Sequence, residues 1–107
     1  MTDIQMIETV TFRLKDGVTD TDFMTVARGL DGYLDRCPGL CARTLSRDET
    51  GLWREDYVWA SEADNAAADS GFRSAPEAQA FMALVDHDSV TMRHAPVSLF
   101  RSLIQAA

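Results

Sequence analysis

GLWREDYVWA, residues 51–60, combines two tryptophans, a tyrosine and a valine behind a glycine, which is the composition of a central β-strand. Side chains alternate between the two faces of a strand. One face carries Trp53, Glu55, Tyr57 and Trp59, and the other carries Leu52, Arg54, Asp56, Val58 and Ala60. Because each face mixes apolar and ionisable groups, neither is plainly a solvent face. We therefore expect helices on one side and a second sheet or a pocket on the other.

Three further segments have the alternating pattern of strands. They are residues 6–14, 40–48 and 90–95. The short polar connection Asp48-Glu49-Thr50-Gly51 predicts a hairpin, so residues 40–48 should pair antiparallel with the central strand.

Helices are predicted between these strands. The apolar spacing predicts one helix over residues 20–36, one from Ser61 to about Asp69 and one over 74–85. Thr19 and Ser61 suit N-cap positions, and Ser74 opens a capping box. Gly71 is expected to interrupt the second helical region, and residues 86–89 are expected to form a loop before the last strand. The tail, residues 97–107, has apolar residues at helical spacing.

The order strand, helix, strand, strand, helices, strand predicts a ferredoxin-like α+β fold. In this fold four antiparallel strands lie in the order 4-1-3-2 and the helices cover one face. We expect a single domain over residues 1–107, with a core of about 5–96 and the tail 97–107. The other face of the sheet would then carry large apolar residues of the central strand, so we expect a homodimer formed through that open face.

Composition narrows the possible partners. The 107-residue chain has a net charge of −7 and a pI of about 4.6, which opposes binding to nucleic acid or to an anionic membrane surface. No segment approaches the roughly 18 to 20 apolar residues that cross a bilayer. The N-terminus shows no basic leader followed by an apolar run. We therefore expect a cytoplasmic protein with neither nucleic-acid nor membrane partners.

Metal and redox sites have weak signals in this sequence. Cys37 and Cys41 flank a predicted turn, and two reduced thiols are favoured over a redox or zinc site because only two histidines are present to complete a metal shell. His87 lies between Asp86 and Asp88, but consecutive residues point in different directions, which favours a polar loop over a metal cluster. No metal and no cofactor are expected.

The chain resembles the dimeric α+β barrel superfamily and, within it, the antibiotic-biosynthesis-monooxygenase-like (ABM-like) proteins. The resemblance covers roughly residues 5–96. It rests on the opening strand Glu8-Thr9-Val10-Thr11-Phe12, the helix-ending Pro38-Gly39, the aromatic strand from Trp53 to Trp59, and Phe81-Met82-Ala83-Leu84 leading into the last strand. It implies a homodimer with a pocket between sheet and helices in each subunit. Characterised members include cofactor-independent monooxygenases that oxidise polycyclic phenols to quinones, and haem-degrading enzymes. The latter use an Asn, Trp and His set, and no predicted strand here has an asparagine.

Glu8 and His94 form the most suggestive pair. In the predicted topology the first and last strands are antiparallel neighbours, which brings both residues to the same end of the sheet. A carboxylate beside an imidazole raises the imidazole pKa and orients the ring, so His94 could act as a base toward a phenol or enol, with Glu8 as its orienting group. The electron-rich carbanion could then react with oxygen. The alternative is a buried hydrogen bond that only holds the sheet edge together.

The remaining candidates are substrate-binding residues: Trp53, Tyr57, Trp59, Arg43 and Phe81. The aromatic rings could line a pocket for a hydrophobic or aromatic molecule, or they could be core or dimer interface. Arg43 or Tyr57 could stabilise an oxyanion, although Arg43 could instead form a salt bridge with Asp56. Three functions follow: a cofactor-independent monooxygenase for an aromatic or enolisable molecule, a non-catalytic small-molecule-binding or stress-associated homodimer, or a purely structural dimer in which the pocket is filled.

Overall fold

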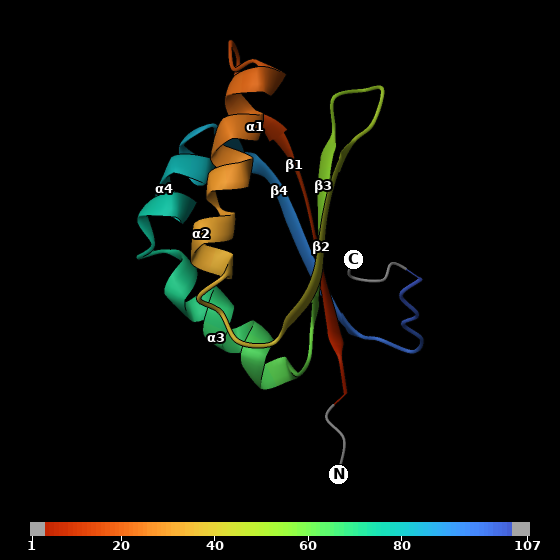
Figure 1. The fold of residues 1–107 in the computed structure, drawn as a ribbon. Coiled ribbons are helices and arrows are strands. Elements are labelled where there is room, and N and C mark those ends of the chain that lie inside the picture. Colours follow the sequence, from red (N-terminus) through yellow and green to blue (C-terminus); the bar gives the residue numbers. More distant parts are fainter. Residues whose placement is uncertain (1–3, 104–107) are drawn as a thin grey trace.

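The computed structural model describes residues 4–103, which form one antiparallel sheet with all helices on one face (Figure 1). The elements in chain order are β1 (Met6–Leu14), α1 (Asp20–Gly29), α2 (Asp31–Leu34), β2 (Leu40–Arg47), β3 (Trp53–Trp59), α3 (Glu62–Phe72), α4 (Pro76–Ala83) and β4 (Val85–Pro96). This is the predicted ferredoxin-like α+β fold. Among the described residues, no helix is long and apolar enough to span a membrane.

The strand order is β2-β3-β1-β4, which is the predicted order read from the opposite edge of the sheet. All three neighbouring pairs are antiparallel. β1 lies between β3 and β4, and its Glu8 pairs with Tyr57 on one side and with His94 on the other. The register therefore places these three residues in one row across the sheet.

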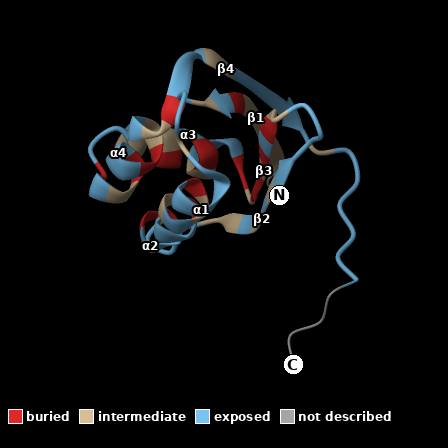
Figure 2. Ribbon diagram, turned by 90° about the horizontal axis from the view of Figure 1, so that it is seen from above, coloured by how far each residue is buried: buried red, intermediate tan, exposed pale blue. Residues whose placement is uncertain are grey.

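The aromatic face of β3 is buried beneath the helices. Trp53, Glu55, Tyr57 and Trp59 are all buried, and Figure 2 shows buried residues concentrated where β3 and β1 face the helix layer. Phe23 of α1 contributes to the same core, with its ring centroid 4.8 Å from that of Trp53. The alternation of one strand thus supplies three of the seven buried aromatic residues among those the structure describes.

The open face of the sheet is more polar than expected. Arg54 is exposed and bonds Asp56 at 2.9 Å, and the Thr9 hydroxyl donates to the same carboxylate at 2.6 Å. The expectation of large apolar residues on this face was wrong, because all three aromatic residues of β3 share the helix-facing side. Val58 is the apolar residue of β3 on the open side.

The predicted helix over residues 20–36 is divided into α1 and α2 at Leu30. Arg43 explains the break, because its Nη1 donates to the Ala27 carbonyl at 2.9 Å. In an uninterrupted α-helix that carbonyl would accept from the amide of residue 31. Thr19 caps α1 as predicted, accepting from the amide of Asp22.

Two other helix predictions were wrong in detail. Gly71 does not interrupt α3, which continues to Phe72, although Ser61 is its N-cap as expected. Ser74 does not cap α4. The N-cap is Ala75, which makes no side-chain hydrogen bond, and Pro76 occupies the first turn, where its missing amide hydrogen costs nothing.

The last strand is longer than predicted. Residues 86–89, expected as a loop, belong to β4, which begins at Val85. A register shift between Thr11 and Arg13 accommodates them, and the Ser89 hydroxyl accepts from the Arg13 amide at 2.8 Å. Residues 97–103 form no helix, and the remainder of the predicted tail helix lies outside the described residues.

Gly71 provides a test of how α2 and α3 pack together. The Tyr33 hydroxyl donates to the Ala68 carbonyl at 2.5 Å, and a Cβ on Gly71 would lie 2.7 Å from that hydroxyl. We expect Gly71→Ala to destabilise the protein by roughly 1 to 2 kcal/mol, since the lost buried hydrogen bond outweighs the gain in helix propensity. Chemical denaturation measures the change.

Gly29→Ala is the matched control. A Cβ at Gly29 meets nothing within 4 Å, so this substitution should stabilise the protein by up to about 1 kcal/mol. Combining Gly71→Ala with Tyr33→Phe should recover part of the loss, because the clashing oxygen is removed. A stabilising effect of Gly71→Ala alone would contradict the packing described here.

Candidate functional site

A cavity of about 270 Å³ lies between the sheet and the helices. Its wall is mainly apolar and includes Val10, Phe12, Tyr33, Tyr57, Trp59 and Phe81. Among the ionisable residues that line it are Glu8 of β1, Glu55 of β3 and Asp69 of α3. Carboxyl groups at the wall of an apolar cavity are unusual, because burial of a charge is costly. This cavity is therefore the candidate functional site.

Glu8 and His94 are in direct contact. The Nε2 atom of His94 lies 2.6 Å from Oε2 of Glu8, as the pairing of β1 with β4 allows. Glu8 is buried, with 4% of the residue exposed, whereas 40% of the His94 side chain is exposed. Glu8 lines the cavity, and His94 lies beside it at the outer edge of the sheet without lining the cavity itself.

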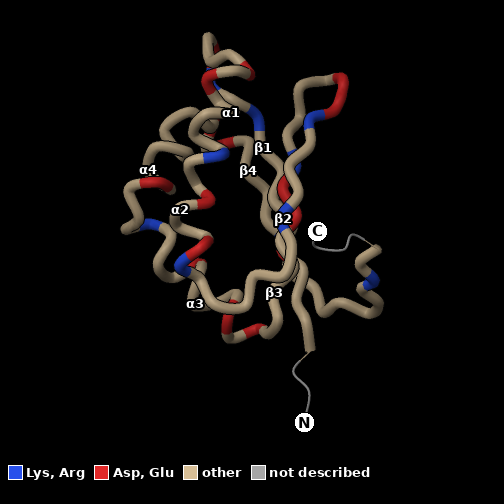
Figure 3. Tube along the Cα trace, in the orientation of Figure 1, with Lys and Arg blue, Asp and Glu red and all other residues tan. Residues whose placement is uncertain are grey.

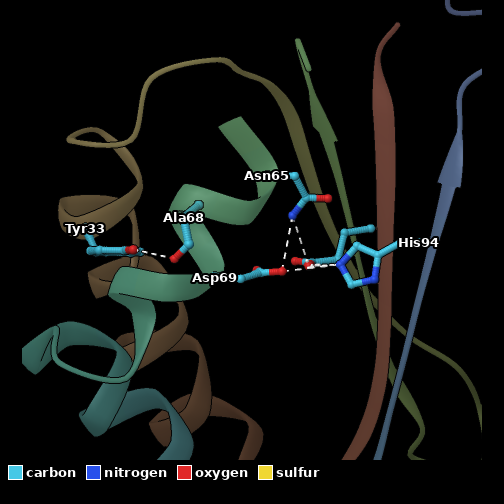
Figure 4. Close-up of polar contacts among 6 residues, drawn as sticks. Tyr33, Asn65, Ala68, Asp69 and His94 are labelled. Carbon is cyan, nitrogen blue, oxygen red and sulfur yellow. Dashed lines mark hydrogen bonds and ion pairs between the residues drawn. The ribbon is translucent and has the colours of Figure 1, made fainter. Parts of the chain in front are cut away.

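Helix α3 adds two residues that the sequence analysis did not include in the site. Asn65 donates from Nδ2 to Glu8 Oε2 at 3.2 Å and to Asp69 Oδ2 at 3.3 Å. His94 Nε2 also lies 3.3 Å from Asp69 Oδ2. Figure 4 shows Asn65 and Asp69 projecting from α3 toward His94 on β4. Their spacing of four residues, which puts both side chains on one helix face, was the available sequence signal.

This network changes the acid–base properties of Glu8. Burial and, to a smaller extent, the neighbouring Asp69 carboxyl raise the pKa of Glu8, and the hydrogen bonds from Asn65 and His94 lower it, so that the net pKa is about 7. Partial burial lowers the pKa of His94, but the contacts with Glu8 and Asp69 outweigh it, so the net shift is upward. The site therefore holds a carboxyl that exchanges its proton near neutral pH.

The same groups are compact enough to be considered as a metal site. One ligand atom from each of Glu8, Asp69 and His94 lies within 4.8 Å of the other two. In the structure, however, His94 Nε2 occupies the space between the two carboxylates and bonds to both. This arrangement is satisfied as a hydrogen-bonded network, and we derive no metal chemistry from it.

A second polar group of the wall lies on β3. The Tyr57 hydroxyl donates to Glu55 Oε2 at 2.7 Å, and Arg43 Nε donates to the same oxygen at 2.8 Å. Arg43 also bonds Asp31 at 2.9 Å. The expected pairing of Arg43 with Asp56 was wrong, because Arg43 lies on the helix side of the sheet and Asp56 on the open side. Arg43 therefore does not line the cavity, but it holds the carboxyl group of Glu55, which does.

The predicted substrate-binding residues therefore separate into two groups. Tyr57, Trp59 and Phe81 line the cavity, with the Tyr57 and Trp59 rings stacked at 6.3 Å. Trp53 packs against Phe23 outside the lining. Trp59 is 1% exposed, and its indole N–H has no hydrogen-bond partner among the described residues. This indole N–H is therefore a buried donor without a partner beside the cavity.

The other sequence candidates lie away from the cavity. His87 is part of β4, and its Nε2 lies 2.9 Å from the Met82 carbonyl. Cys37 and Cys41 are free thiols. In Figure 3 basic residues are scattered along the described trace and interspersed with acidic ones, without a continuous basic stripe.

The raised pKa of Glu8 predicts how stability depends on pH. The folded state retains a proton that the unfolded state releases above about 4.5, so the free energy of unfolding should fall as the pH rises from about 4.5 through about 7. His94, whose pKa is also raised, contributes in the same direction. Denaturation at a series of pH values measures this slope.

Glu8→Gln should flatten the slope, because an amide keeps the shape of the side chain and does not titrate. Glu49→Gln, in the exposed β2–β3 turn, is the control and should leave the slope unchanged. A Glu8→Gln protein with the wild-type pH dependence would show that Glu8 does not carry the shifted titration.

Comparison with known proteins supports the fold assignment. No protein-family model matches the chain, and no curated protein is significantly similar in sequence. Solved structures do match. SnoaB, a cofactor-independent oxygenase from Streptomyces nogalater, superposes with a TM-score of 0.68 at 19% identity, over 95% of this chain and 99% of SnoaB.

Two further structures extend the comparison. A putative antibiotic biosynthesis monooxygenase from Chloroflexus aurantiacus matches with a TM-score of 0.65 at 14% identity, over 92% of this chain and 98% of its own. A dimeric ferredoxin-like protein of unknown function from Thermobifida fusca matches with a TM-score of 0.66 at 14% identity, over 89% of this chain and 92% of its own. At these identities the similarity concerns the fold, and this chain has the ferredoxin-like fold of the ABM-like proteins.

Proposed function

We propose that this protein is a cofactor-independent monooxygenase that oxidises a small phenol or enol in the cavity between sheet and helices. The observation that carries the proposal is Glu8, a buried carboxyl with a pKa of about 7 at the wall of an apolar cavity. A general base whose pKa lies near the working pH is well matched to removing a proton from a weakly acidic hydroxyl. The fold shared with SnoaB adds support.

In this proposal Glu8 accepts the proton and His94 positions it. This exchanges the roles expected from the sequence, because Glu8 lines the cavity and His94 stands behind it. The imidazole bond at 2.6 Å fixes the carboxylate and favours its charged form. Asn65 and Asp69 hold the same carboxyl from the side of the helix layer.

The reaction balances with dioxygen as the only co-reactant. Glu8 removes the hydroxyl proton of a phenol, which makes the ring carbon opposite the oxygen electron-rich. That carbon gives two electrons to O₂ and forms a C–O bond, giving a peroxide. Loss of the ring proton and cleavage of the O–O bond then release water and leave a quinone. The proton that Glu8 took leaves with that water, so the carboxylate is regenerated.

The cavity wall supports the other requirements of this reaction. Tyr57 and Trp59 line the cavity and give a flat ring system aromatic side chains to contact. The apolar lining limits the water that would compete for Glu8.

A non-catalytic binding protein is the competing function. The cavity alone favours it, because a mainly apolar cavity can bind a hydrophobic metabolite without any chemistry. The two functions differ in oxygen consumption, since only the monooxygenase converts bound phenol to quinone.

Glu8→Gln tests the proposed base. We expect wild-type protein to convert 1-naphthol or 1,5-dihydroxynaphthalene to the corresponding quinone, with kcat/KM rising through pH of about 7 as Glu8 ionises. Glu8→Gln should lower kcat by about 100-fold or more, because a general base contributes roughly 10²- to 10⁴-fold. Oxygen uptake and quinone absorbance measure both quantities.

His94→Gln tests the positioning role. Removal of the imidazole takes away an interaction that favours the charged carboxylate, so the pH profile should move to higher pH with a smaller loss of kcat. Dialysis against EDTA should leave the wild-type rate unchanged. Binding of the naphthols without oxygen uptake would favour the binding protein, and a rate lost in EDTA would indicate a metal at Glu8, Asp69 and His94.

We also propose that the protein is a homodimer that pairs through the open face of the sheet. Within residues 4–103 no helix covers that face (Figure 1), and one protein with the same fold is described as dimeric. Since the face is polar, the interface should contain hydrogen bonds and ion pairs around Asp56 as well as apolar contacts.

Light scattering during size-exclusion chromatography tests this assembly. Wild-type protein should elute with twice the chain mass of 11.8 kDa. Thr44→Arg, on the exposed open side opposite Asp56, should shift the protein toward monomer because it adds bulk at the interface. Thr25→Arg, which makes the same change on exposed α1, should remain dimeric. A monomeric wild type would refute the proposal.

A further inference from the structure

We infer that Glu55 is a second recognition group of the cavity, which selects ligands that carry a second hydroxyl at the end opposite the one facing Glu8. This inference rests on the proposed function of the cavity and deepens it, because it specifies the substrate as an aromatic diol rather than any small phenol.

Glu55 has an oxygen that no protein group uses. The residue is 2% exposed and lines the cavity. Both of its hydrogen bonds, from Tyr57 and from Arg43, reach the same atom, Oε2. Among the described residues Oε1 receives no hydrogen bond. A carboxyl whose hydrogen bonds all reach one oxygen keeps acceptor capacity for a ligand in the cavity that it lines.

The surroundings hold this carboxyl in place at some cost. Arg43 itself is fixed by the Ala27 carbonyl and by Asp31, and its Nη2 is buried without a partner. A buried ion pair of this kind contributes little net stability compared with apolar residues of the same volume. The arrangement is therefore better explained by what the carboxyl binds than by the stability it adds.

The sheet register sets the relative positions of the two recognition groups. Glu8 pairs with Tyr57, and Glu55 pairs with Val10, so Glu8 and Glu55 are diagonal neighbours on the same face. The Glu8 carboxyl bonds His94 on β4 and the Glu55 carboxyl bonds Arg43 on β2, so the two carboxyls diverge toward opposite edges of the sheet. A ligand that reaches both therefore carries its two hydroxyls at opposite ends.

The volume of the cavity agrees with a ligand of this size. At about 270 Å³ it lies just below the range of roughly 300 to 1,000 Å³ that is typical of sites for drug-sized molecules. Glu8, Glu55, Tyr57 and Trp59 all line this cavity, so a ligand of two fused rings would meet both aromatic side chains and both carboxyl groups there. A hydroxyl is the complementary group for Glu55, because it can donate to the free oxygen.

Three naphthols test the inference by binding alone. Isothermal titration under anaerobic conditions, which prevents turnover, compares 1,5-dihydroxynaphthalene with 1-naphthol and with 5-methoxy-1-naphthol. The methoxy compound occupies the same position but cannot donate a hydrogen bond. We expect wild-type protein to bind the diol about tenfold or more tightly than either of the others, as for a hydrogen bond to a charged acceptor.

Glu55→Gln tests whether the preference for the diol depends on Glu55. The amide can place an N–H₂ where the free oxygen stood, so discrimination between hydroxyl and methoxy should shrink to about threefold or less. Glu49→Gln, in the exposed β2–β3 turn, should keep the wild-type preference. The comparison of ligands on wild-type protein keeps the test decisive even if Glu55→Gln does not fold.

Each outcome discriminates. A diol preference that disappears in Glu55→Gln supports the inference. Equal binding of all three naphthols by the wild type overturns the inference and leaves the proposed function standing. A diol preference unchanged in Glu55→Gln overturns the role of Glu55. Binding of none of the three overturns both the inference and the proposed function.

Discussion

The alternation of side chains along β3 is the constraint on which the rest of the structure depends. It puts three aromatic rings and Glu55 on the side that faces the helices, and Arg54 and Asp56 on the other. A shift of register by one residue would expose all three rings and bury both charged groups. The same alternation gives the cavity its aromatic wall and leaves the open face polar. The core, the candidate site and the open face therefore all depend on the alternation along β3.

Much of this arrangement could be predicted from the sequence because it depends on local patterns. The period of two in residues 6–14 and 51–60 determined the strands, and strand order followed from the short hairpin and the helix connections. The Glu8–His94 contact was predictable for the same reason, since antiparallel pairing of the first and last strands fixes which residues are opposite.

What the sequence did not show depends on contacts between elements. The break at Leu30 arises because Arg43 on β2 binds the Ala27 carbonyl, a contact between residues 16 positions apart. Asn65 and Asp69 joined the site through the packing of α3 on the sheet, which no pattern within α3 specifies. The sequence also did not show on which side of the sheet Arg43 lies. That became clear only from the register, in which Arg43 pairs with Tyr57.

The two carboxyls of the cavity differ because their surroundings differ. Glu8 contacts a second acid and a partly exposed imidazole, so its proton is shared within a network that reaches solvent through His94. Glu55 contacts a partly buried guanidinium and a phenol, and both bind the same oxygen, Oε2. The first arrangement suits a group that gives and takes protons, and the second suits a group that stays in place and binds. One face of the sheet thus carries both the proposed base, Glu8, and the proposed recognition group, Glu55. The two residues are diagonal neighbours on adjacent strands.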